Sequence, residues 1–470
     1  MGNRSNRREF FKIVGGAAAA PSMLRAAEAM TSGITNALRS SGDVQALAGN
    51  LLPNVPVGVA KGIHPGRVVW VHDPNATNWE GPGKGHLWEN EHTDPDAVEN
   101  MMSGALRRLT GKSNDREAWH ALFKYFNHSQ GRGNEGYRKG EKITIKVNMV
   151  GCNNRAGGVD PQSYDLVRNI DYMNASPQMM RALLRQLIHA AGVHPQDISI
   201  GDPLTLFPNQ YYETLHQEFP DVHYLDHWGG NASHPRAAVP YSSVPVYWSS
   251  RPTGVTQDYV PVAYAEAKYF INMASLKGHA SAGVTLCAKN HYGSLIRKPP
   301  EKGYYDMHTS VLGKALRSPG QYRALVDLMG HAHLGGKTMV YLIDGLYSGV
   351  HVVDHSPRKW STAPFNGHWT SSFFASQDPV AIDSVGFDFL WAEWDDQARL
   401  TGADDYLHEA ALADNPPSGT FYDPNHPTNT TRLASLGVHE HWNNAQDKQY
   451  SGNLGKREGI ELIALGPRAA

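Results

Sequence analysis

The chain has 470 residues, and 43 lysines and arginines stand against 45 aspartates and glutamates, which leaves a formal net charge of −2. This balance, without blocks of like charge, argues against nucleic acid or an anionic membrane surface as a partner. Two cysteines, Cys152 and Cys287, are too few for a disulfide framework, a four-thiolate zinc site or an iron–sulfur cluster, although a single bridge between them stays open. The 24 histidines could supply imidazole ligands for a transition metal ion.

The first residues have the features of an export signal. The stretch RSNRREFFKIVGGAAAA places Arg7 and Arg8 before a short apolar run, and a small-x-small cleavage site ends at Ala29. We predict a twin-arginine signal over 1–29, read by the twin-arginine translocation machinery, and a periplasmic or otherwise exported mature protein. The apolar run is too short to span a bilayer, and we expect no membrane span later in the chain. Because this route carries folded, often cofactor-loaded proteins, it favours a metal or cofactor enzyme.

After a lead-in segment at 30–55, short apolar runs alternate with segments of helical period. The helical period predicts helices over 96–111, 176–192 and 321–336, the second with Ser176 as its N-cap. Apolar runs that end in polar or glycine residues predict strands at 67–73, 142–149, 197–203, 268–275 and 338–345. The alternation predicts an α/β fold with a mostly parallel central sheet and helices on both faces, built over 56–470 as one domain or as two fused lobes.

Polar side chains stand where the predicted strands end, which is where parallel sheets bind their ligands. A further segment, GVTLCA, is expected to be a second strand that delivers three more polar residues to the same cleft. Together these positions are His72, Asp73, Lys146, Asn148, Asp202, Lys277, His279, Asp344, Lys289, Asn290 and His291. We expect the segments around 143–148, 198–201, 269–273 and 339–343 to be neighbours in the sheet, so that these groups share one cleft.

The residue types suggest roles in a site for a small-molecule ligand. Histidines that burial and nearby lysines keep neutral can move a proton or bind a metal, while lysines hold an anionic group and aspartates bind metal or orient histidines. The candidate catalytic residues are Lys277, His279, Lys289 and His291. The candidate substrate-binding residues are Lys146, Asn148 and Asn290, and the candidate metal ligands are Asp202, His279, His291 and Asp344.

Several motifs, in a fixed order, resemble those of the domain of unknown function 362 family. They are KVNM, DISIGDP, INMASLKGHASAGVTLCAKNHYG, VYLIDGLYSG and ASQDPVAIDSVGFDFL, and the resemblance covers about residues 140–395. The flanking segments are similar to those of the larger, exported members. Some members carry ferredoxin-like cysteine motifs, from which this chain departs, so the resemblance implies no iron–sulfur cluster here.

The element LKGHASAGVTLCAKNHYG is also similar in shape to a segment of the nickel-pincer lactate racemase family, although the full racemase motif is not present. That likeness implies a lactate-racemase-like isomerase that moves a hydride at a hydroxyl-bearing carbon. Lys277 or Lys289 would be the cofactor tether or carboxylate clamp, and His279 and His291 would be the acid and base.

Other conspicuous residues have alternative explanations. We interpret His331 and His333 as surface residues, and we expect His439 and His441 to hold the C-terminal tail over the cleft by hydrogen bonds rather than to bind metal. Asp378 is expected to cap a helix, and Asp383, one turn into that helix, is a candidate to face the cleft. Five tryptophans could stack on a sugar, although tryptophan is more often part of a core: Trp70, Trp79, Trp88, Trp360 and Trp369.

Two classes of function follow from these observations. The first is an exported, metal- or cofactor-dependent enzyme that acts on a small polar molecule bearing a carboxylate or a hydroxyl. The second is a periplasmic binding protein without catalysis that holds a sugar or a small anion.

Overall fold

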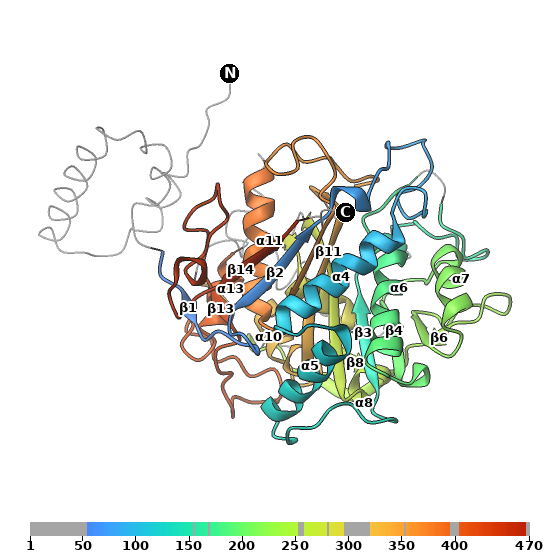
Figure 1. Ribbon diagram of the computed structural model, residues 1–470. Coiled ribbons are helices and arrows are strands. Elements are labelled where there is room, and N and C mark those ends of the chain that lie inside the picture. Colours follow the sequence, from blue (N-terminus) through green and yellow to red (C-terminus); the bar gives the residue numbers. More distant parts are fainter. Residues whose placement is uncertain are drawn as a thin grey trace, which may run out of the picture.

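A computed structural model describes residues 54–153, 156–167, 170–251, 258–279, 282–295, 320–351, 354–394 and 404–466. The predicted signal over 1–29 and all of the lead-in but residues 54–55 lie outside these ranges. The described residues form a ten-stranded central sheet with helices on both of its faces (Figure 1). The predicted α/β fold class, with a mostly parallel sheet, is confirmed.

The sheet is parallel from β11 to β6, and β12 runs antiparallel to both of its neighbours. In spatial order its strands are β14 (Glu461–Leu465), β2 (Arg67–His72), β12 (Ser372–Ser376), β11 (Thr338–Gly349), β9 (Tyr269–His279), β3 (Ile143–Val147), β4 (Ile198–Gly201), β5 (His223–Asp226) and β6 (Ala237–Ala238). The short strand β10 (Gly283–Thr285) pairs antiparallel with the end of β9. Two small ribbons lie outside this sheet and pair β1 (Val57–Gly58) with β13 (Val438–His439) and β7 (Tyr241–Val246) with β8 (Asp258–Pro261).

Each face of the sheet buries its own apolar core. The helices on one face, at the front of Figure 1, are α4 (Pro95–Thr110), α5 (Asp115–Ser129), α6 (Pro177–Arg185) and α7 (Asn209–Glu218). The helices on the other face are α8 (Val262–Glu266), α9 (Cys287–Asn290), α10 (Ala324–Gly330), α11 (Pro379–Glu393) and α13 (Asp405–Ala411). Strands β3, β9, β11 and β12 are buried along their whole length, which is why they read as continuous apolar runs.

The expected neighbours in the sheet are confirmed, because β11, β9, β3 and β4 lie side by side in that order. The helix expected over 176–192 begins as predicted, with Ser176 Oγ accepting a hydrogen bond from the Met179 amide at 3.1 Å. After α6 the chain continues as a π-helical turn over Gln186–Ala190, and Gly192 adopts a left-handed φ of 73°. The helix expected over 321–336 is shorter than predicted and ends at Gly330.

Several residues interpreted as exposed or reactive are core residues. His331 follows the end of α10 and is buried, with its Nε2 atom 3.1 Å from the Pro245 carbonyl oxygen, so the surface interpretation was wrong for this residue. Of the five tryptophans considered for sugar stacking, all but Trp88 are buried in the two cores. Cys152 and Cys287 are both free thiols, and they belong to the cores on opposite faces of the sheet.

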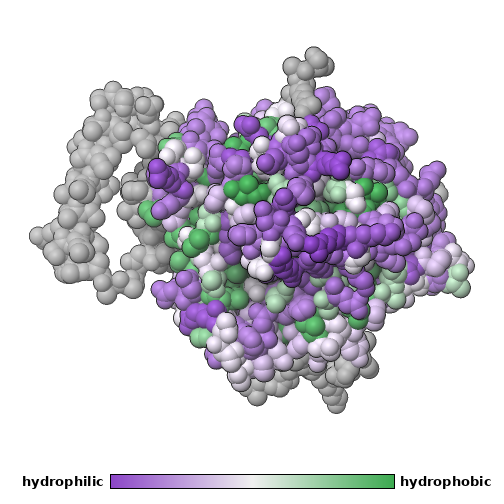
Figure 2. Space-filling view, turned by 60° about the horizontal axis from the view of Figure 1, so that its bottom comes forward, coloured by the Kyte–Doolittle hydropathy of each residue, from purple (hydrophilic) through white to green (hydrophobic). Residues whose placement is uncertain are grey.

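The face drawn in Figure 2 is mostly hydrophilic, and its apolar residues are scattered in small groups. Apolar residues scattered in this way are normal on a protein surface. Among the described helices, none has the length and the hydropathy that crossing a bilayer would require.

Candidate functional site

The carboxyl ends of four adjacent strands bring most of the predicted site residues together. Lys146 lies in β3, Asp202 directly follows β4, Lys277 lies near the end of β9, and Asp344 lies in β11 opposite Ser275 of β9. All of these side chains are buried. The residues at the end of β2 are not part of this group, because β12 and β11 separate β2 from β9.

On one face of the sheet, Lys146 and Asp202 form a buried ion pair. The Lys146 Nζ and Asp202 Oδ2 atoms are 3.0 Å apart, and the two side chains are only 1% and 5% exposed. Burial lowers the pKa of Lys146, while the charge of Asp202 opposes that shift. Lys146 also donates to the Asn290 Oδ1 atom at 2.8 Å, and the Met149 amide donates to Asp202 at 3.2 Å. Asn290 and the Met149 amide therefore fix the positions of the two members of the ion pair.

Gly293 allows this ion pair to lie close to the backbone. A Cβ atom at position 293 would lie 2.9 Å from the Lys146 Nζ atom and 3.0 Å from the Asp202 Oδ1 atom. A side chain at this position would therefore push the two charged groups away. The glycine of the Lys-Asn-x-x-Gly pattern has a packing role that the sequence alone did not reveal.

Asn290 connects two adjacent strands of the sheet, β3 and β9, through its side chain. Its Nδ2 atom donates to the Asn272 Oδ1 atom at 2.8 Å and to the Met273 carbonyl at 3.2 Å, and its Oδ1 atom accepts from Lys146 and from Asn148 Nδ2 at 3.3 Å. These bonds use most of the hydrogen-bonding capacity of the amide, so Asn290 orients its neighbours. We did not predict Asn272 as a site residue, although an asparagine inside an otherwise apolar strand indicates a polar contact within the sheet.

The segment GVTLCA is a strand only as far as Thr285, so the predicted longer strand was wrong beyond that point. Helix α9 begins at Cys287 because the Asp383 carboxylate accepts hydrogen bonds from the Cys287 amide at 2.8 Å and the Ala288 amide at 2.9 Å. Asp383 is fully buried, and burial raises the pKa of this carboxyl to about 6. Asp383 therefore fixes the start of α9, which carries Lys289 and Asn290. Asp378 caps α11, as predicted.

His291 is a buried histidine whose ring nitrogens have no hydrogen-bond partner among the described residues. Its ring lies 5.2 Å from that of Phe270, centroid to centroid. Burial, followed by the charge of Lys146, lowers the pKa of His291 to about 3. The imidazole is therefore neutral near pH 7, which is the form expected from the sequence.

Lys277 and Asp344 lie on the other face of the sheet. Alternate side chains of a strand point to opposite faces, and Ile271 and Met273 of β9 belong to the core beneath α6, so Lys277 points to that side. Its ammonium group donates to the Met173 carbonyl. Burial lowers the pKa of Lys277 to about 7, although the charges of Asp344 and Asp202 oppose this shift.

Asp344 is held by two backbone groups beside Lys277. Its carboxylate accepts from the Ser176 amide at 2.8 Å and from the Leu346 amide at 3.0 Å. Burial raises the pKa of Asp344 in spite of these bonds. Two buried hydroxyls nearby on the strands, Ser275 and Ser348, have no hydrogen-bond partner among the described residues.

His279, at the end of β9, and Lys289, in α9, are also buried. His279 Nδ1 accepts from the Ala282 amide at 3.1 Å, and its ring centroid is 6.0 Å from that of His351. The Lys289 Nζ atom lies 4.2 Å from the centroid of the Tyr292 ring, a distance at which a cation interacts with an aromatic face.

The four candidate metal ligands are not grouped around a common point. Within the ranges that the structure describes, no three histidine, cysteine, aspartate or glutamate side chains are arranged to hold a metal ion. These residues therefore do not fit a metal centre as placed, and we derive no reaction step through one. Metal binding stays a prediction from the sequence.

The histidines of the C-terminal segment are fixed to α11. His439 Nδ1 lies 2.8 Å from the Ser384 Oγ atom, and His441 Nδ1 lies 2.6 Å from the Asp388 Oδ1 atom. The charges of Asp388 and Asp404 outweigh burial and raise the pKa of His441 to about 10. Hydrogen bonds do hold this segment in place, and they attach it to α11.

Comparison with known proteins identifies the family. No curated protein matches the chain. The family described as domain of unknown function (DUF362) matches residues 143–388, which include β3, β4, β9, β11, α9 and the carboxylate of Asp383. Because this match covers more than half of the chain, the protein belongs to the DUF362 family.

Proposed function

We propose that this protein is an exported enzyme that moves a proton on a small polar molecule bearing a carboxylate or a hydroxyl group, with Lys277 as the proton acceptor. The observation that carries this proposal is a fully buried lysine, at the carboxyl end of a central strand, whose pKa is lowered to about 7. Strongly shifted pKa values are common among catalytic acids and bases.

The chemistry follows from the groups around Lys277. Near pH 7 a large fraction of its side chain is a neutral amine, which can accept a proton from an O–H group or from a C–H group next to a carboxylate. The negative charge of Asp344 stabilises the ammonium group that forms. The hydroxyls of Ser275 and Ser348 can then pair with the polar groups of the substrate, because buried hydroxyls are normally hydrogen-bonded.

On the opposite face, Lys146, Asp202 and Asn290 bond one another, which supports a role in fixing the strand ends. We assign the substrate carboxylate to the buried Lys289 of α9, because a lysine ammonium group acts as a point charge. His291 is the second group able to exchange a proton. Each of these roles is part of the proposal.

The proposed activity is tested by solvent exchange. The purified protein is incubated in D2O with a panel of small 2-hydroxy, 2-oxo and 2-amino acids, and deuterium uptake at carbon is followed by NMR. We expect exchange in at least one compound with the wild type and none with Lys277→Met. The matched control is Lys337→Met. Lys337 is also buried with a pKa lowered to about 8, but it lies at the amino end of β11 and donates to the Ala267 carbonyl at 2.8 Å.

The other functions predict different results in the same experiment. A binding protein would bind a member of the panel without exchange, and a lactate-racemase-like isomerase would interconvert enantiomers without deuterium uptake, because a hydride returns to the same carbon. Equal exchange by the wild type and Lys277→Met would contradict the assignment of Lys277.

Export is tested separately through the paired arginines. Replacing Arg7 and Arg8 by lysine should leave the folded protein in the cytoplasm, because the twin-arginine receptor reads this pair. Fractionation followed by immunoblotting measures the result, and undiminished export of the variant would point to another route.

A further inference from the structure

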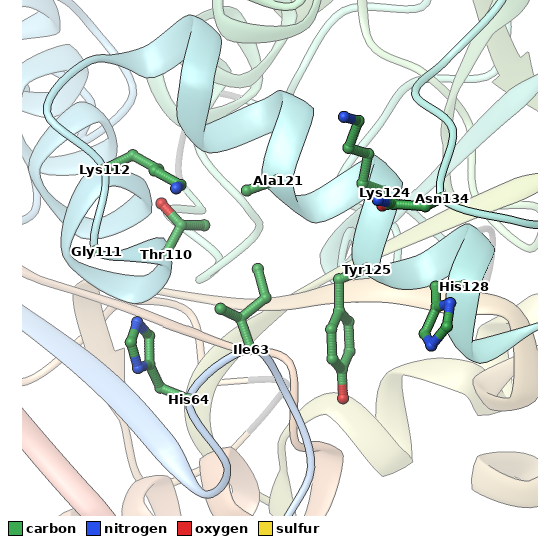
Figure 3. A pocket seen from close by; sticks show the side chains of 10 residues that line it. All are labelled: Ile63, His64, Thr110, Gly111, Lys112, Ala121, Lys124, Tyr125, His128 and Asn134. Atoms are coloured by element: carbon green, nitrogen blue, oxygen red, sulfur yellow. The ribbon is translucent and has the colours of Figure 1, made fainter.

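A groove of about 620 Å³ lies on the protein, and none of the strand-end site residues lines it. It is formed by the segment that precedes β2, the C-terminal end of α4 and one side of α5 (Figure 3). Its volume is in the range of sites that bind small molecules. Its lining consists of Ile63, His64, Thr110, Gly111, Lys112, Ala121, Lys124, Tyr125, His128 and Asn134.

The charge of this lining has a single sign. Its positive charge is on Lys112 and Lys124, and it contains no aspartate or glutamate. Burial and the charge of Arg67 lower the pKa of His64. Neither Lys112 nor Lys124 forms an ion pair with any residue of the described ranges. Basic residues close by are neutralised, since Arg107 pairs with Asp115 at 2.7 Å and Arg67 pairs with Glu461 at 2.8 Å. The groove thus concentrates uncompensated positive charge on a protein whose net charge is −2.

The basic side chains lie at the two ends of the groove. Figure 3 shows His64 and Lys112 on one side and Lys124 and His128 on the other, with Ile63 between them. Tyr125 also lines this middle part, and its hydroxyl accepts a hydrogen bond from the Gly62 amide at 3.0 Å, which fixes the ring. The groove therefore has one lysine at each end and is largely apolar in the middle.

We propose that this groove binds a metabolite-sized organic dianion. Its two anionic groups contact Lys112 at one end and Lys124 at the other, and its apolar middle part lies against Ile63 and Tyr125. A single anion can contact only one end, and an apolar molecule gains nothing from the lysines. The inference is independent of the proposed activity, because it uses none of the residues at the carboxyl ends of the strands.

The test is a calorimetric titration of the full-length protein at low ionic strength with the dicarboxylates glutarate, adipate and suberate and with the monocarboxylate hexanoate. We expect one dicarboxylate to bind more tightly than hexanoate, with an optimum in chain length. Lys112→Gln and Lys124→Gln should each weaken dicarboxylate binding by a factor of roughly two to five, as expected for partly exposed ion pairs. The matched control Lys139→Gln, which removes an exposed lysine outside the groove, should leave the affinity unchanged.

Three results would overturn the proposal. Hexanoate could bind as tightly as every dicarboxylate, or the Lys139→Gln variant could lose as much affinity as the two groove variants. Loss of dicarboxylate binding in Lys277→Met, with binding retained in both groove variants, would place the dianion at the strand ends instead. Melting temperatures of all variants show whether a loss of binding reflects a loss of folding.

Discussion

Replacing His291 by leucine should make the protein more resistant to acid. Burial lowers the pKa of His291 to about 3 in the folded protein, against an ordinary value of 6.5 in the unfolded chain. Between these two values the unfolded chain binds a proton that the folded protein does not bind. This difference lowers the free energy of unfolding by about 1.4 kcal/mol for each pH unit, or by about 3 kcal/mol between neutral pH and pH 4.5. The leucine variant should lack this part of the acid sensitivity.

Urea unfolding of both proteins between about pH 7.5 and 4.5 measures the effect. At neutral pH the variant should differ from the wild type by less than about 1.5 kcal/mol, because the imidazole has no hydrogen-bond partner among the described residues and leucine is similar in size. An exposed histidine outside the site, replaced in His120→Gln, is the matched control. If the wild type and His291→Leu lose stability equally on acidification, the imidazole is solvated or bonded in the folded protein and the burial argument is refuted.

Three further perturbations concern the groups around the site. Lys146→Met leaves the Asp202 carboxylate buried without its partner and should lower the free energy of unfolding, measured in urea, by about 3–5 kcal/mol. The double variant Lys146→Met with Asp202→Leu should lose less. If the stability losses of the two single variants add up in the double variant, the pairing is contradicted. Gly293→Ala should lower the free energy of unfolding by about 1–3 kcal/mol, because the added methyl group displaces the ion pair. The control Gly104→Ala should not lower it, because its added methyl group meets nothing closer than 3.8 Å. Equal effects of the two substitutions would argue against the close contact at Gly293. Asp383→Ala removes the hydrogen-bond acceptor of two amides at the start of α9 and should lower the free energy of unfolding by about 1–3 kcal/mol for each amide left without a partner. Hydrogen exchange in α9 should become faster. Unchanged exchange would show that the cap is dispensable.

The sequence predicted the centre of the sheet better than the elements that pack on it. Strands β3, β4, β9 and β11 are apolar runs, because helices cover both faces, and their polar ends follow from the parallel arrangement. Helix α9 was not predicted. Its start depends on the Asp383 carboxylate, which is 96 residues away from Cys287, and no local pattern contains such a contact.

The grouping of the site residues was only partly predictable for the same reason. Strand ends can be read from the sequence, but the face to which each side chain points depends on the register within the sheet. Lys146 and Lys277 end adjacent strands, yet one contacts Asn290 of α9 and the other contacts Met173 before α6. The sequence therefore did not reveal that these residues are divided between the two faces of the sheet, although the charge of Asp202 still acts on the pKa of Lys277.

The position of β14 has a consequence for the biosynthesis of this protein. Strand β2, near residue 70, pairs in parallel with β14 at residues 461–465, and β2 lies between β14 and the strands of the family region. The sheet therefore cannot be completed until residue 465 has left the ribosome. Contacts between such distant segments form slowly. Until then β2 has one unpaired edge, which can pair with other chains and promote aggregation. An export route that requires a folded cargo can therefore act only after residues 461–465 have become available for pairing.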